Sequence, residues 1–124
     1  MRILIAEDDE MLNALLADYL TELGHSVKSA ANGKELLLLA LTERPDLVVT
    51  DLHMPEMAGH SMIAMLDMYP GLSGLPVIII SGATAAEMAD MGIPKEIPVL
   101  PKPFDFAKIA LAVERVSRGR EYRP

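Results

Sequence analysis

The stretch Arg2-Ile3-Leu4-Ile5-Ala6-Glu7-Asp8-Asp9 decides the fold that this sequence predicts. Residues 3–6 are all apolar, without the alternation of a strand that has one face in water. This pattern is typical of a strand buried on both faces of a parallel sheet. The apolar run stops abruptly at three acids. We therefore expect carboxylates at the carboxyl end of a buried strand.

Further segments predict four more strands and five helices. The clearest strand is Pro76-Val77-Ile78-Ile79-Ile80, and the full set of strands after the first covers residues 26–30, 46–51, 76–80 and 97–100. Apolar residues at helical spacing predict helices over residues 10–23, 33–43, 60–69, 84–91 and from residue 106 onward. Buried strands that alternate with amphipathic helices predict an α/β fold, with one doubly wound parallel sheet covered by helices on both faces.

Length and composition predict a single globular domain. The chain has 124 residues, enough for one hydrophobic core, and no cysteine, which excludes disulfides and fits the cytoplasm. Its net charge of −7 would repel a phosphate backbone, so direct nucleic-acid binding is not expected. The longest apolar run, 36–41, is far below the roughly 18 residues of a membrane span, and the run after Arg2 is too short for a signal peptide.

Four of the predicted strands deliver polar groups to one edge of the sheet, where ligands of such folds bind. These groups are the side chains of Glu7, Asp8, Asp51, Ser81 and Lys102. Crowded carboxylates repel one another unless a cation neutralises them, and a site made of oxygen atoms suits Mg²⁺. The lysine and the hydroxyl would then face an anion. Together the residues predict a site that stabilises a phosphoryl group during its transfer.

Over nearly its whole length the chain resembles the receiver domains of two-component response regulators. The matching pieces are residues 2–9, Asp51-Leu52-His53-Met54-Pro55 with Gly59, Ser81-Gly82 and Lys102-Pro103-Phe104. The resemblance implies a flavodoxin-like fold and one cytoplasmic receiver domain over residues 1–124. It also implies a phosphoryl group received from a histidine kinase or a histidine phosphotransfer protein, an unknown downstream protein partner, and no conventional enzyme activity.

The resemblance further implies a role for each matching acid and its neighbours. Asp51 is the expected phosphoacceptor. Asp8 is the expected direct ligand of Mg²⁺, with Glu7 acting through water, whereas Asp9 is expected only to start a helix. His53 would offer the metal its backbone carbonyl rather than its imidazole.

The remaining matches concern the phosphoryl oxygens and the output of the signal. Ser81, which precedes Gly82, and Lys102 are expected to bind those oxygens, and the Lys102–Pro103 peptide bond is expected to be cis. Val99 stands where the family carries its aromatic switch residue. Residues 83–102 are rich in glycine and proline and look short of a full fourth helix. Because valine cannot swing as an aromatic ring does, we expect the backbone around residues 82–92 to carry the signal, with residues 83–97 becoming more ordered on phosphorylation.

Two other classes of protein remain open. A phosphorylation-independent pseudo-receiver usually lacks the acceptor or the lysine, and this chain has both Asp51 and Lys102. An aspartate-nucleophile phosphohydrolase of the haloacid-dehalogenase type would need a carboxylate two places after the nucleophile, where His53 stands. Uptake of phosphate from a small phosphodonor would separate these classes.

Overall fold

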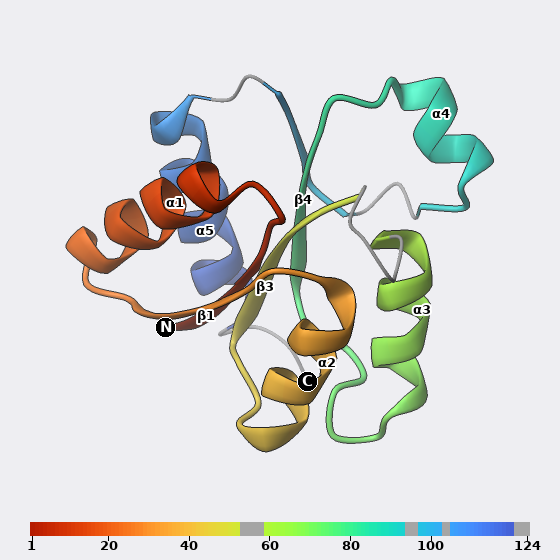
Figure 1. Cartoon of the computed structure of the whole chain (residues 1–124), viewed down its shortest axis with the longest axis horizontal. Helices are drawn as coiled ribbons and strands as arrows, with labels where there is room; N and C mark the ends of the chain where they lie inside the picture. The colour runs from red at the N-terminus through yellow and green to blue at the C-terminus, as the bar shows by residue number, and fades with distance from the viewer. Residues whose placement is uncertain (53–58, 94–96, 103–104, 121–124) are drawn as a thin grey trace.

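The parallel sheet has the strand order β2-β1-β3-β4-β5 in the computed structural model, which describes residues 1–52, 59–93, 97–102 and 105–120 (Figure 1). The strands are β1 (Arg2–Ala6), β2 (Ser26–Ala30), β3 (Leu47–Asp51), β4 (Val77–Ser81) and β5 (Val99–Pro101). The helices of the described part are α1 (Glu10–Glu22), α2 (Gly33–Thr42), α3 (Gly59–Met68), α4 (Ala85–Asp90) and α5 (Phe106–Arg120). The predicted flavodoxin-like α/β fold is confirmed.

The strands bury both of their faces, which explains the unbroken apolar runs in the sequence. Successive side chains of a strand point to opposite faces, so Ile3 and Ile5 of β1 enter one core and Leu4 and Ala6 the other. The first core is completed by α1 and α5, and the second by α2, α3 and the segment around α4. Figure 1 shows α1 and α5 close together, apart from α2 and α3.

Three helices begin at residues whose side chains accept a backbone N–H from three positions further on. These N-cap residues are Asp9, Asn32 and Thr84. Asp9 therefore starts α1, as expected, and its carboxylate is engaged by the helix. Gly24 and Gly92 follow α1 and α4 with φ values of 96° and 76°, a conformation that glycine adopts without steric cost.

The fifth strand differs from its prediction by its position. It was predicted over residues 97–100 and is found at Val99–Pro101. Pro98 has no N–H to donate, but its carbonyl still accepts from Ile79 N at 2.9 Å, so regular pairing begins one residue later. The strand lies at the edge of the sheet, where proline is tolerated. The short fourth helix is confirmed, since α4 has six residues.

Two leucines, one in α1 and one in α2, allow a matched test of the packing. Leu16 of α1 is fully buried, whereas Leu38 of α2 is 59% exposed. We expect Leu16→Ala to lower the free energy of unfolding by about 2–5 kcal/mol, because it removes buried methyl groups and leaves a cavity. Leu38→Ala should change it by about 0.5 kcal/mol or less. Urea unfolding measures both values, and equal losses would contradict the described packing.

Candidate functional site

The candidate site lies where the connections of the sheet diverge. β1 is flanked by β2 on one side and by β3 on the other, so the chain leaves the carboxyl ends of β1 and β3 in opposite directions. Glu7 and Asp8 directly follow β1, and Asp51 is the last residue of β3. Ligands bind at such a switch point because the diverging loops leave a hollow there.

Three carboxylates meet at these strand ends, and we call Glu7, Asp8 and Asp51 the acid cluster. One carboxylate oxygen from each lies within 4.8 Å of the others, in the described part of the chain. Glu7 and Asp51 are 3% and 7% exposed, while Asp8 is exposed. The cluster thus has two inner acids and one that reaches solvent.

Lys102 joins the two inner acids. Its Nζ donates to Glu7 Oε1 at 2.8 Å and to Asp51 Oδ2 at 2.9 Å. Its backbone N–H donates to the carbonyl of Ser81 at 3.0 Å, which ties the end of β5 to the end of β4. The structure therefore brings residues from four strand ends together, although their chemical roles stay predictions.

Lys102 places a single cationic group beside the three acids of the cluster. Burial raises the pKa of Glu7 above its ordinary value, and Asp8 and Asp51 add to this, while the hydrogen bond from Lys102 opposes it. Burial alone would lower the pKa of Lys102, but its hydrogen bonds to Glu7 and Asp51 and their charges outweigh burial and raise it. Three hard oxygen donors with one exposed member fit a Mg²⁺ ion that keeps part of its water shell.

Ser81 lies at the end of β4, one residue beyond Ile80, which pairs with Asp51. Its side chain is fully buried, and Oγ accepts from Ala83 N at 2.9 Å. This bond is ordinary turn chemistry, yet it leaves the hydroxyl hydrogen able to donate to a ligand. Gly82 stands between these two residues, in a place where a Cβ atom would meet no other atom within 4 Å.

Of the three remaining predicted positions, the structure describes one. Val99 is half-buried in β5, pairs with Ile79 and packs against the core on the α2 side of the sheet. His53 and Pro103 lie outside the described residues. The carbonyl ligand expected from His53 and the cis peptide bond expected before Pro103 therefore stay predictions.

Two buried polar residues beside the acid cluster were missed in the sequence. Asn13 donates from Nδ2 to Glu7 O at 2.9 Å and to Ala30 O at 3.0 Å, and Thr50 donates from Oγ1 to Asp51 O at 3.0 Å. Asn13 carries a weak signal, because it lies on the same buried stripe of α1 as Leu16 and Leu20, where an apolar residue would be expected. Thr50 carries none, since threonine is common in strands.

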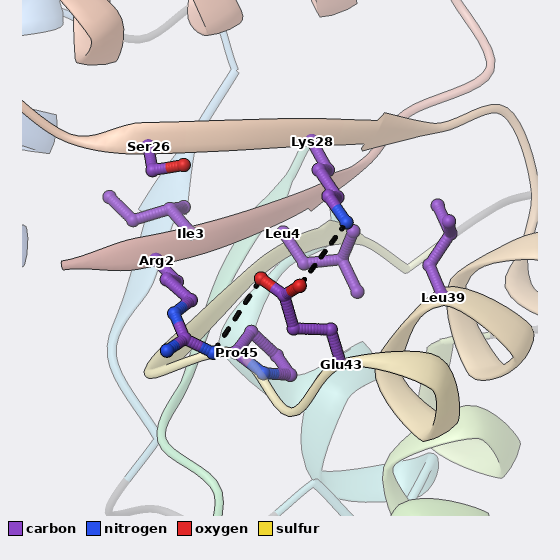
Figure 2. A pocket seen from close by; sticks show the side chains of 8 residues that line it. All are labelled: Arg2, Ile3, Leu4, Ser26, Lys28, Leu39, Glu43 and Pro45. Carbon is purple, nitrogen blue, oxygen red and sulfur yellow. Dashed lines mark ion pairs between the residues drawn. The ribbon is translucent and has the colours of Figure 1, made fainter.

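A hollow lies at the opposite edge of the sheet, by the amino ends of β1 and β2 and the end of α2 (Figure 2). Arg2 and Lys28 both pair there with Glu43, at 3.5 and 3.8 Å. All three side chains are about half exposed, so each pair contributes little to stability. This hollow supplies control positions far along the strands from the acid cluster.

The family model of the response regulator receiver domain matches residues 3–114. The chain belongs to this family. This receiver domain is 34% identical over 119 residues to the probable transcriptional regulatory protein SilR of Salmonella typhimurium, covering 95% of the chain and 51% of that protein. It is 32% identical over 121 residues to the DNA-binding transcriptional regulator NtrC of Azospirillum brasilense, covering 91% and 23%. The chain thus spans about half, or less, of the length of these curated relatives.

A solved structure agrees with this assignment. The signal receiver domain of a signal transduction histidine kinase from Syntrophus aciditrophicus matches with a TM-score of 0.89 and 27% identity, covering 99% of this chain and 94% of that one. Receiver domains generally take a phosphoryl group from histidine kinases, bind Mg²⁺ at an acidic pocket and are not conventional enzymes. No helix within the described parts of this receiver domain has the length and apolar character to span a bilayer.

The raised pKa of Glu7 predicts how pH affects the metal-free receiver domain. The folded state binds this proton more tightly than the unfolded chain, so the free energy of unfolding should fall as pH rises from the ordinary pKa of 4.5 through the raised value. The slope from one group is at most about 1.4 kcal/mol per pH unit. Glu7→Gln should remove this component.

Urea unfolding of metal-free protein at several pH values between 4.5 and neutrality measures the slope. The exposed Glu43 provides the matched control, and Glu43→Gln should keep the wild-type slope. Equal slopes for wild type and Glu7→Gln would show that burial does not raise the pKa of Glu7.

Proposed function

We propose that this receiver domain accepts a phosphoryl group onto Asp51 from a histidine kinase or a histidine phosphotransfer protein, in a Mg²⁺-dependent reaction that switches its protein contacts. The observation that carries the proposal is the double contact of Lys102 Nζ with Glu7 and Asp51 inside the acid cluster. A buried carboxylate in such a place is suited to attack phosphorus, while the ammonium group and a cation held by the acids would offset the charge of the phosphoryl oxygens.

The reaction forms a bond between an Asp51 carboxylate oxygen and phosphorus while the bond from phosphorus to the donor nitrogen breaks, and the donor keeps that electron pair. Asp8, Asp51 and the carbonyl of His53 would hold Mg²⁺, with Glu7 acting through water. When bound, the ion would offset the negative charge of the reacting groups. The ammonium group of Lys102 would donate a hydrogen bond to one phosphoryl oxygen, and the Ser81 hydroxyl would donate to a second phosphoryl oxygen.

The product is an acyl phosphate, which water can hydrolyse, so the signal limits its own lifetime. Phosphorylation would shift an equilibrium between two conformations of one fold. Residues 1–124 would act as one cytoplasmic receiver domain, and the absence of cysteine fits a reducing compartment. SilR and NtrC are named as transcriptional regulators. This chain, with a net charge of −7, would pass its signal to a protein rather than contact DNA itself.

The phosphoacceptor assignment is tested by intact-mass measurement after incubation with acetyl phosphate and Mg²⁺. Wild type should gain the mass of one phosphoryl group, and Asp51→Asn should gain none, because an amide oxygen is a poor nucleophile. Asp9→Asn is the matched control, since asparagine can keep the helix cap of α1 and the exchange is equally conservative.

Phosphate uptake by Asp51→Asn at the wild-type level would refute the assignment. No uptake by wild type would favour the phosphorylation-independent binding module. Release of inorganic phosphate without accumulation of phosphorylated protein would favour the phosphohydrolase.

The metal assignment is tested by calorimetric titration with MgCl₂. Asp8→Ala should weaken Mg²⁺ binding most, because Asp8 is the proposed direct ligand. Glu7→Ala should weaken it by on the order of tenfold, as is typical of a partner outside the inner coordination shell. Glu43→Ala, which alters the hollow at the opposite edge of the sheet, should leave the affinity unchanged. Unaltered affinity in Asp8→Ala would exclude Asp8 as a ligand.

A further inference from the structure

The side chain of Asn13 connects three segments of the chain next to the acid cluster. Its Nδ2 donates to Glu7 O after β1 and to Ala30 O at the end of β2. Both acceptors are carbonyls, so only the NH₂ group of the amide can face them. The side chain is 9% exposed, and Ala30 O also accepts from Glu7 N at 3.1 Å. These bonds close a small buried network around the point where β1 ends.

Asn13 also holds the chain on the other side of Asp8. Its backbone N–H donates to Asp9 O at 2.9 Å, as the first turn of α1 requires. The carbonyls of residues 7 and 9 therefore both accept from Asn13, and Asp8 lies between them. Asp8 is the exposed acid of the cluster.

The planarity of the peptide bond converts these contacts into a constraint on Asp8. The carbonyl of Glu7 shares one plane with the nitrogen and the Cα atom of Asp8. A hydrogen bond that fixes the direction of this carbonyl also fixes the direction in which the chain enters Asp8. The β1–β2 pairing ends at Ala6 and Ala30, and the bond from Glu7 N to Ala30 O holds the N–H of Glu7 but not its carbonyl.

We propose that Asn13 is a positioning residue for the acid cluster, which holds Glu7 and Asp8 in place for a divalent cation. The inference rests on the proposed function. Without the amide, mutual repulsion of the three carboxylates would favour conformations in which Asp8 turns away from Asp51. A cation would then have to draw the acids together again, at a cost in affinity.

Mg²⁺ titration by calorimetry separates positioning from simple stabilisation. Asn13→Ala removes both side-chain bonds, and we expect Mg²⁺ affinity to fall on the order of tenfold. Asn32→Ala is the matched control, because it also removes an asparagine bond to the backbone, at the start of α2. We expect it to lose stability in urea while keeping wild-type Mg²⁺ affinity. Asn13→Ser, whose short hydroxyl reaches at most one carbonyl, should also weaken binding and is available if Asn13→Ala does not fold.

The outcomes distinguish this inference from the proposed function. Wild-type Mg²⁺ affinity in a folded Asn13 variant would overturn the inference alone, and so would equal weakening in Asn32→Ala, which would indicate general loosening. A wild-type chain that binds no Mg²⁺ would overturn the proposed function and this inference with it. Weakened affinity confined to the Asn13 variants supports the inference.

Discussion

The contact of Lys102 with Glu7 and Asp51 is the interaction on which the rest of the site depends. Both carboxylates are almost fully buried, and removal of their shared counter-charge would leave two acids uncompensated in a poorly solvated place. Lys102 directly follows the edge strand β5, so the ion pairs also bind the end of β5 to the ends of β1 and β3. Such an arrangement is a costly way to gain stability, since well-packed apolar residues do as well or better. The arrangement instead holds the positive charge of Lys102 next to the proposed phosphoacceptor, Asp51.

The strands of the sheet could be predicted from the sequence because a strand buried on both faces is a continuous run of apolar residues. β4 reads Val-Ile-Ile-Ile-Ser, and the fully buried β3 ends in the acid predicted as acceptor. β5 was placed less well, because an edge strand with proline has weak periodicity and its start depends on pairing with Ile79. Strand order and register rest on contacts between distant residues, which short-range patterns do not encode.

The three consecutive acids after β1 have different surroundings in the structure that the sequence pattern does not distinguish. In the sequence Glu7, Asp8 and Asp9 look alike, and family resemblance separated their roles. In the structure each has a different surrounding: Glu7 meets Lys102, Asp8 reaches solvent, and Asp9 caps α1. The hydrogen bonds of Asn13 could not be predicted from the sequence for a related reason. Its acceptors are the backbone carbonyls of Glu7 and Ala30, which any residue at those positions would supply, so the partners leave no trace in the sequence.

Ser81 connects the site with the start of α4. Ser81 Oγ accepts from Ala83 N, and Ala83 directly precedes Thr84, the cap of α4. A helix of six residues gains little from its own hydrogen bonds and depends on its cap and on packing. Movement of the Ser81 hydroxyl toward a phosphoryl oxygen would therefore act on the start of α4 through the backbone. Val99, stiff about its first torsion and packed against the core, offers no second rotating side chain to share that movement.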